Sequence, residues 1–170
     1  WKTGNSSGVN YTTQNMPGTV KSEGIELISN LKYNSNLSFG LNYTYTNTYD
    51  GAEQDDPDKS SSFLSSQMVR VPRHLVNLNT QFNFPNNENL AISLNTKWSE
   101  DTREYGNGNR TYNDERNESY LVNDLSLNYK LFNSYNLFFN INNIFDEKYE
   151  TVKDYSQMDR SFNFGLKRLY

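Results

Sequence analysis

The chain has no cysteine and only one histidine among its 170 residues. The absence of cysteine excludes a disulfide framework and any thiolate metal site, and the single His74 excludes a multi-histidine metal cluster. No run of about 18 apolar residues occurs, so the sequence contains no transmembrane helix. The net charge is −4 and no block of basic residues is present, which argues against nucleic acid as a partner.

A secretory leader is also missing, and the chain begins with Trp1 instead of methionine. We therefore expect a fragment or a trimmed chain, so the missing leader says little about the cellular compartment. The mean hydropathy of −0.90 is close to that of disordered chains. However, 13 tyrosines and 10 phenylalanines argue for a folded protein, because disordered segments contain few aromatic residues.

Apolar and polar residues alternate in seven separate runs of the sequence. In one run Leu90, Ile92 and Leu94 point to one side, while Ser93 and Asn95 point to the other. A period of two is the signature of a β-strand, because successive side chains leave opposite faces of the sheet. The predicted strands cover residues 25–33, 37–45, 76–84, 90–98, 121–131, 137–142 and 162–170.

The polar side of these strands is rich in asparagine, serine and threonine, where a soluble sandwich would carry more lysine and glutamate. Such side chains suit the wall of a water-filled barrel whose other face meets lipid. This arrangement also explains how a chain of low mean hydropathy can cross a membrane, because only every second residue needs to be apolar. A soluble antiparallel sheet remains the alternative, since alternation is common to both architectures.

The connections between the predicted strands alternate strictly between short and long. The short ones are residues 34–36, 85–89 and 133–135, and the longer polar ones are residues 51–66, 105–116 and 151–158. Outer-membrane barrels have tight turns on the periplasmic rim and larger loops on the extracellular rim. Ten residues at ~3.3 Å each, tilted by ~45°, span roughly 23 Å, which matches the apolar band of such a barrel. The predicted fold class is therefore all-β, an antiparallel meander of about seven transmembrane strands.

Aromatic residues lie near the ends of the apolar runs. Barrels place such rings at the two water–lipid interfaces, but ordinary cross-strand packing favours them as well, so both interpretations stay open for each ring. These residues are Tyr33, Tyr43, Tyr45, Phe84, Trp98, Tyr129, Tyr149 and Tyr170.

Four segments resemble TonB-dependent outer-membrane receptors, which are gated barrels that import scarce nutrients. Asn140–Tyr149, which ends in Asn-Ile-Phe-Asp-x-x-Tyr, resembles the approach to the last strand of these barrels. Gly24–Glu26 and Leu41–Tyr45 resemble a descending strand and the ascending strand after it, and Arg70–His74 resembles the entry into the next. The order and spacing of the four segments agree over essentially the whole chain.

The resemblance implies both a larger fold and a function. The family's barrels have about 22 strands, so residues 1–170 are expected to be the C-terminal part of the barrel, without the plug domain, the TonB box and the earlier strands. The implied function is active transport of cobalamin or a ferric siderophore across the bacterial outer membrane, energised through TonB. Within the family the likeness is nearest to the vitamin B12 (cobalamin) transporter, because of Phe145–Val152 with Tyr155 and Arg160.

The implied partners are outer-membrane lipid, the barrel-assembly machinery, the TonB complex through the missing plug, and a small-molecule ligand. No enzymatic activity and no cofactor are expected. Seven strands cannot close such a pore alone, so we expect a curved open sheet with two unpaired edges. Two alternatives remain, namely a passive porin or structural outer-membrane barrel, and a secreted carbohydrate-binding β-sandwich.

Ligand recognition is expected in the three longer connections. The resemblance places Tyr155 on the final extracellular loop, facing the substrate, and Asp154, Tyr105 and Tyr112 are further candidates. Each of the four also has an interpretation as an ordinary loop residue, because loops vary freely.

The C-terminus resembles the signal that the barrel-assembly machinery reads, with polar residues between aromatic and apolar ones. Two departures occur, because the last ring is a tyrosine instead of the usual phenylalanine and Arg168 stands where an apolar residue is expected. The signal residues are Phe162, Phe164, Gly165, Leu166 and Tyr170.

No catalytic constellation is present in the sequence. His74 has no serine or cysteine partner at a suggestive spacing. The acidic run at residues 53–58 has oxygen ligands suited to calcium, but it lacks the glycine and distal glutamate of an EF-hand loop, so a solvated loop is favoured. Residues 106–109 resemble a loop tip, because no helix follows them to bind phosphate.

Overall fold

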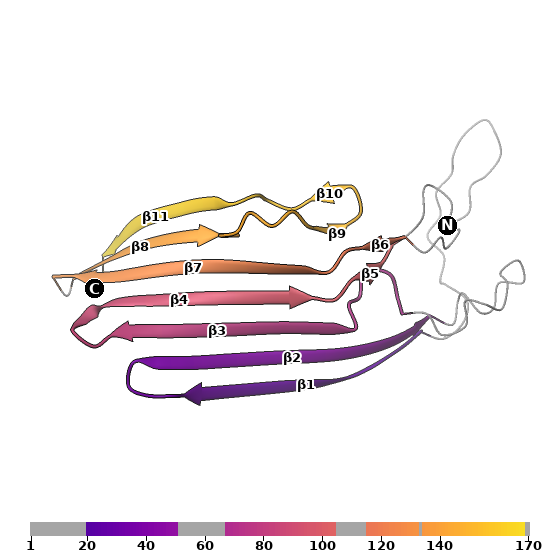
Figure 1. Ribbon diagram of the computed structural model, residues 1–170, viewed down its shortest axis with the longest axis horizontal. Helices are drawn as coiled ribbons and strands as arrows, with labels where there is room; N and C mark the ends of the chain where they lie inside the picture. The colour runs from indigo at the N-terminus through magenta and orange to yellow at the C-terminus, as the bar shows by residue number, and fades with distance from the viewer. Residues whose placement is uncertain (1–19, 51–66, 105–114, 133, 169–170) are drawn as a thin grey trace, which may run out of the picture.

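The structure is a computed structural model that describes residues 20–50, 67–104, 115–132 and 134–168. These residues form one antiparallel sheet of seven long strands in the order β1-β2-β3-β4-β7-β8-β11 (Figure 1). The meander confirms the predicted fold class. The strands are β1 (Val20–Lys32), β2 (Leu37–Asp50), β3 (His74–Phe84), β4 (Asn87–Ser99), β7 (Tyr120–Leu131), β8 (Tyr135–Asn142) and β11 (Ser161–Arg168).

Two short hairpins stand at one end of this sheet. One joins β5 (Thr102–Arg103) to β6 (Arg116–Asn117), and the other joins β9 (Glu150–Val152) to β10 (Tyr155–Ser156). Figure 1 places both at the end that carries the longer connections, opposite the tight turns. The sequence does not predict these hairpins, because two or three residues are too few to show alternation.

The strand register sorts the side chains onto two faces of opposite character. On one face, called the apolar face below, Leu94 of β4 pairs with Leu125 of β7, Leu125 pairs with Ile141 of β8, and Ile141 pairs with Phe162 of β11. The other face, called the amide face, carries the asparagine and serine pairs Asn42–Asn77, Asn79–Asn95, Ser93–Ser126 and Asn140–Asn163. Because a strand alternates its side chains, one register fixes both faces.

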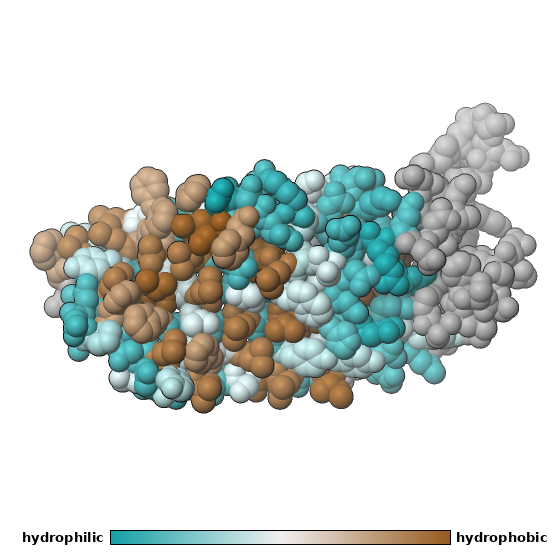
Figure 2. Space-filling model, in the orientation of Figure 1, coloured by the Kyte–Doolittle hydropathy of each residue, from teal (hydrophilic) through white to brown (hydrophobic). Residues whose placement is uncertain are grey.

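No second layer covers the apolar face within the described part of the chain. Among the described hydrophobic residues only Tyr120 and Val122 are buried, and both lie on the amide face, whereas Ile25 is 69% exposed and Phe164 is 83% exposed. Figure 2 shows hydrophobic residues spread over the long strands and hydrophilic residues gathered at the end with the short hairpins. In water so large an apolar surface would be covered or would aggregate, so its natural neighbour is hydrocarbon.

The tight turn between β1 and β2 shows how the short connections close. The side-chain oxygen of Asn34 accepts hydrogen bonds from the backbone N–H groups of Asn36 and Leu37, both at 2.8 Å. This Asx-turn replaces the ladder bonds that the chain loses when it reverses. The asparagine that opens the turn is therefore part of its mechanism.

Aromatic residues meet at the end of the apolar face that lies next to the longer connections. The hydroxyl of Tyr43 lies 2.8 Å from Nδ1 of His74, and the ring of Tyr45 lies 5.3 Å from the ring of His74. These rings therefore make cross-strand contacts and also stand where a barrel has its interfacial girdle. Among the described residues, no helix is long and apolar enough to cross a membrane.

Candidate functional site

The end of the sheet with the longer connections, called the rim below, is the candidate functional site. It consists of residues 67–71, 100–104, 115–118 and 143–160. A buried carboxylate joins all four of these segments. The side chain of Glu104 is only 1% exposed, and Arg70 approaches it as a fork, with Nε at 2.9–3.0 Å from both carboxylate oxygens and Nη2 at 2.7 Å from Oε1.

Two further donors reach Glu104 from elsewhere in the chain. Asn117 of β6 donates its side-chain amide to Oε2 at 3.2 Å, and the backbone N–H of Lys153 donates to the same oxygen at 3.1 Å. The ammonium of Lys153 also forms an ion pair with Glu115, and this hydrogen bond raises the pKa of Lys153 above its ordinary value. The carboxylate is thus paired and hydrogen-bonded, as a buried charge must be. We call these residues the Glu104 knot.

Gln67 fastens the first rim segment to the end of β2. Its side-chain oxygen accepts from the backbone N–H of Thr48 at 2.9 Å, and its amide donates to the carbonyl of Thr46 at 2.9 Å. Arg103 donates to the carbonyl of Gln67 at 2.8 Å. The rim therefore continues the hydrogen-bonding of the sheet beyond the membrane-spanning strands.

The segment Asn143–Tyr149 folds into a compact corner after β8. Asn143 has a φ of 52°, a left-handed conformation that asparagine adopts more readily than most residues. Its side chain exchanges two hydrogen bonds with the backbone of Glu147, each at 2.9 Å, and its own N–H donates to Asp124 at 2.8 Å. Asn143 is buried, so the corner depends on it for satisfied polar groups.

Charged residues close this corner against the start of β11. Asp146 accepts a hydrogen bond from the backbone N–H of Arg160 at 2.8 Å. This bond, followed by the hydrogen bond from Lys148, lowers the pKa of Asp146. Lys148 lies 2.6 Å from Asp159 and 3.3 Å from Asp146. These contacts, of which that with Asp159 is the largest, raise the pKa of Lys148.

A hollow of about 190 Å³ lies between the rim and the amide face. Lys97 stands 5.6 Å from the centre of the Tyr120 ring, which packs against Tyr149 with ring centres 4.4 Å apart. Desolvation, and next the neighbouring Tyr120, raise the pKa of Tyr149. Arg70, Lys97, Glu118, Tyr120 and Glu150 are among the residues that line the hollow. It offers aromatic surface and charge of both signs to a ligand.

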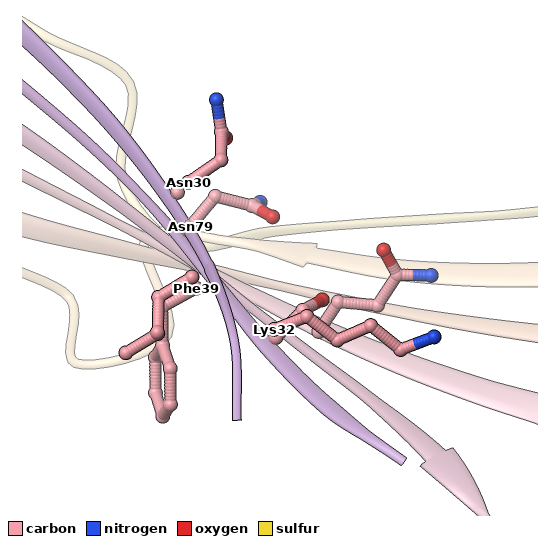
Figure 3. A pocket seen from close by; sticks show the side chains of 8 residues that line it. Asn30, Lys32, Phe39 and Asn79 are labelled. Atoms are coloured by element: carbon pink, nitrogen blue, oxygen red, sulfur yellow. The ribbon is translucent and has the colours of Figure 1, made fainter. Parts of the chain in front are cut away.

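The amide face continues away from the rim as a polar wall. A hollow of about 400 Å³ near the tight turns is lined by Asn30, Lys32 and Asn79, among other residues. Figure 3 shows Asn30 and Asn79 on one side of the sheet and Phe39 on the opposite side. Uncharged amides that both donate and accept hydrogen bonds can line a solvated passage without attracting ions of one sign.

The structure places two of the four predicted ligand-binding residues, Tyr155 and Asp154, on the exposed part of the rim. Tyr155 begins β10 and is 70% exposed, and Asp154 occupies the preceding turn with a φ of 63°. Tyr105 and Tyr112 lie outside the described residues. The acidic run at residues 53–58 also lies outside them, and the described part of the chain holds no group of three or more potential metal ligands.

Four of the predicted assembly-signal residues lie on β11. Phe162, Phe164 and Leu166 are exposed on the apolar face. Gly165 pairs with Phe138, whose ring lies so close that a Cβ at residue 165 would be 2.5 Å from its Cζ. An aromatic ring over a cross-strand glycine shields the exposed backbone of the strand. Tyr170 lies outside the described residues.

The sequence does not predict the Glu104 knot. Arg70, Asn117 and Lys153 are 34, 13 and 49 residues from Glu104, and no local pattern joins them. The Arg70–His74 segment is a partial signal, since it marks the position of the arginine without indicating its partner.

A single-layer sheet with one apolar face, one amide face and a loop-bearing rim defines a segment of a membrane β-barrel wall. The chain matches, over residues 2–144, the family described as TonB dependent receptor-like, beta-barrel. It therefore belongs to this family of outer-membrane receptors, which are transporters and not enzymes. No curated protein matches the chain.

Solved structures with the same fold come from several bacteria. The ferric-catecholate import receptor Fiu from E. coli K12 has a TM-score of 0.69 at 17% identity, covering 88% of this chain and 21% of that one. The ferripyoverdine receptor of Pseudomonas aeruginosa has a TM-score of 0.64 at 20% identity, covering 86% and 19%. The siderophore receptor PiuA from Acinetobacter baumannii has a TM-score of 0.63 at 21% identity, covering 89% and 21%. The chain thus spans about a fifth of the length of each of these neighbours.

Proposed function

We propose that this chain is the C-terminal part of the barrel of an outer-membrane receptor that imports a ferric siderophore with energy supplied through TonB. The observation that carries the proposal is the continuity between the amide face and the charged, aromatic rim. A ligand captured at the rim would meet a polar wall along its whole path, while the apolar face stays in lipid.

Under this proposal the seven strands end a barrel whose earlier strands and plug domain precede residue 1. The two free edges of the sheet support this view, because within the described residues β1 pairs only with β2 and β11 only with β8. Unpaired edges are not tolerated in hydrocarbon, so each edge needs a neighbouring strand.

A siderophore is favoured over cobalamin for two reasons. The structural neighbours named above include a ferripyoverdine receptor, a ferric-catecholate receptor and a siderophore receptor. In addition, several residues that carry the likeness to the cobalamin transporter serve the folding of the corner. Asp146 caps the N–H of Arg160, and Arg160 donates to the carbonyl of Ile144 at 3.2 Å. Their presence is explained without a ligand.

Cobalamin remains the second candidate because of Tyr155. This ring is exposed on the β9–β10 hairpin, and within the described residues its side chain forms no hydrogen bond and no ring contact. The hollow beneath the hairpin is small, so a bulky ligand would rest on the rim instead of inside it. Either ligand class would bind through aromatic surface supplemented by a few hydrogen bonds.

The test uses the full-length receptor in a strain that lacks other siderophore receptors. We expect uptake of iron-loaded siderophore that disappears when TonB is deleted. Tyr155→Ala should weaken binding, whereas Phe132→Ala should leave it unchanged, because Phe132 is an exposed ring at the opposite end of the sheet. Uptake of cobalamin with no siderophore uptake would transfer the proposal to the second candidate. Passive, TonB-independent diffusion would identify a porin instead.

A further inference from the structure

We propose that Glu104 is a positioning residue for ligand binding, because it locks the β9–β10 hairpin to the other rim segments. This inference rests on the proposed function, since it concerns how the receptor holds its ligand-facing loop. Glu104 itself is shielded, with a side chain 1% exposed. It cannot touch a ligand at the rim and acts only through the residues that it holds.

The Glu104 knot joins the β9–β10 hairpin to the β5–β6 hairpin, which the strand ladders leave apart. Glu104 follows β5, Arg70 belongs to the connection before β3, Asn117 ends β6, and Lys153 follows β9. β9–β10 and β5–β6 form two-stranded sheets separate from the main sheet. The hydrogen bond from Lys153 to this carboxylate therefore connects the two hairpins, which strand pairing does not.

The hairpin is attached on the side that carries Lys153. The backbone N–H of Lys153 bonds Glu104, its ammonium pairs with Glu115, and Asn117 reaches the carbonyl of Thr151 at 3.5 Å. Asp154 and Tyr155 follow immediately and are exposed. The contacts that hold the hairpin are thus largely half-buried, whereas Asp154 and Tyr155 beside them are exposed to a ligand.

The geometry of the Arg70 contact makes the Glu104 knot rigid. A forked arginine–carboxylate pair fixes orientation as well as distance. Arg70 also has a φ of 62°, a strained value for a residue other than glycine that persists only where surrounding contacts enforce it. Its backbone N–H donates to the carbonyl of Arg103 at 2.9 Å. Side chain and backbone of Arg70 therefore both hold the first rim segment against β5.

A rigid hairpin raises affinity because the ligand need not order it on binding. When Glu104 is replaced by glutamine, one acceptor oxygen becomes an N–H₂ group and the charge that holds the arginine fork is lost. The hairpin then remains attached beside β6 through the Lys153–Glu115 ion pair, but its hold on the end of β5 is weakened, so its position relative to β5 is less fixed. We expect the dissociation constant for the ligand to rise by roughly 10-fold, through pre-organisation alone.

The experiment compares Glu104→Gln with wild type in the full-length receptor. Binding of ferripyoverdine, a ferric catecholate and cyanocobalamin is measured, together with the amount in the outer membrane and heat-modifiable migration. Spin labels at Ser119 and Ser156, both exposed, report the distance distribution between the β6–β7 connection and the hairpin. The matched control is Asp101→Asn, which removes an ion pair with Arg116 that lies on the same rim but is far more exposed.

For Glu104→Gln the proposal predicts normal assembly, a higher dissociation constant and a broader distance distribution. For Asp101→Asn it predicts no change in any of the three. Unchanged affinity and an unchanged distance distribution would overturn it. So would an affinity that equals the wild-type value once binding is expressed per assembled receptor. If Glu104→Gln does not assemble, Arg70→Lys replaces it, since this variant keeps the charge but loses the fork.

The experiment distinguishes a wrong transport proposal from a wrong proposal for the role of Glu104. If wild type binds none of the three probes, the transport proposal fails, but the spin-label distances still test whether Glu104 fixes the hairpin. If wild type binds one probe, and Glu104→Gln binds it equally well with the same spin-label distances, only the positioning role of Glu104 is refuted.

Discussion

An arginine placed in the middle of the apolar face should be far more costly than one placed on the amide face. On β7 the outward residues run from Tyr129 to Leu121, which pairs with Trp98, and Leu125 lies midway. Four residues at ~3.3 Å, tilted by ~45°, place Leu125 roughly 9 Å in depth from either end of this run. Arginine at such a depth costs about 2–4 kcal/mol, falling to about 0–1 kcal/mol near an interface.

The assay is denaturant unfolding of the full-length receptor reconstituted in lipid vesicles, followed by heat-modifiable migration. Leu125→Arg should lose about 2–4 kcal/mol and Tyr129→Arg about 0–1 kcal/mol. The control is Ser126→Arg, whose side chain lies on the amide face between Ser93 and Asn140 and should change the stability little. If Ser126→Arg were as destabilising as Leu125→Arg, or if depth had no influence, the assignment of the two faces would be refuted.

Three further predictions concern the corner and the last strand. Gly165→Ala should destabilise the receptor by about 1–3 kcal/mol through overpacking, because the new methyl group meets the ring of Phe138. Adding Phe138→Ala to this variant should recover the unfolding midpoint, and a midpoint that does not recover would refute the contact. Asn143→Ala should lower the free energy of unfolding by about 2–4 kcal/mol in the same assay. The variant loses two hydrogen bonds and the asparagine that favours the left-handed backbone conformation at this position. A decrease below about 0.5 kcal/mol would show that the corner does not need this side chain. Because folding lowers the pKa of Asp146 below its ordinary 3.8, its contribution is complete above that pH and is lost as the pH falls through the lowered value. The protection factor of the Arg160 amide in hydrogen exchange should fall there, and Asp146→Ala, which has no acceptor, should show the low protection factor at every pH.

The seven strands could be predicted from the sequence because their period is local and one register fixes the whole sheet. The predicted strand ends were less accurate. β1 begins at Val20 and β2 continues to Asp50, beyond the predicted 25–33 and 37–45. Outside the apolar band the outward residues become polar, as where Asn47 donates to Glu23 at 3.2 Å. Alternation therefore disappears from the sequence while the strand ladder continues.

The rim was predictable only in part. The segment Asn140–Tyr149 is informative as a family resemblance. However, its fold depends on hydrogen bonds of Asn143 to Asp124 and to the carbonyl of Met158, and no sequence spacing predicts these partners. The Glu104 knot depends on partners from segments distant in sequence. Whether Tyr155 and Asp154 bind a ligand stays a prediction, because exposure on a hairpin fits that role without requiring it.

The most direct test of the central claim is the accessibility of spin labels placed one by one at residues 90–98 of β4 in the reconstituted full-length receptor. Collision with oxygen, which concentrates in lipid, and with a water-soluble nickel chelate is measured at each position. The account predicts two opposite oscillations of period two, with oxygen highest at Leu90, Ile92 and Leu94 and the nickel chelate highest at Ser93 and Asn95. Labels on the apolar side that are shielded from both reagents would show a second protein layer and would contradict the account.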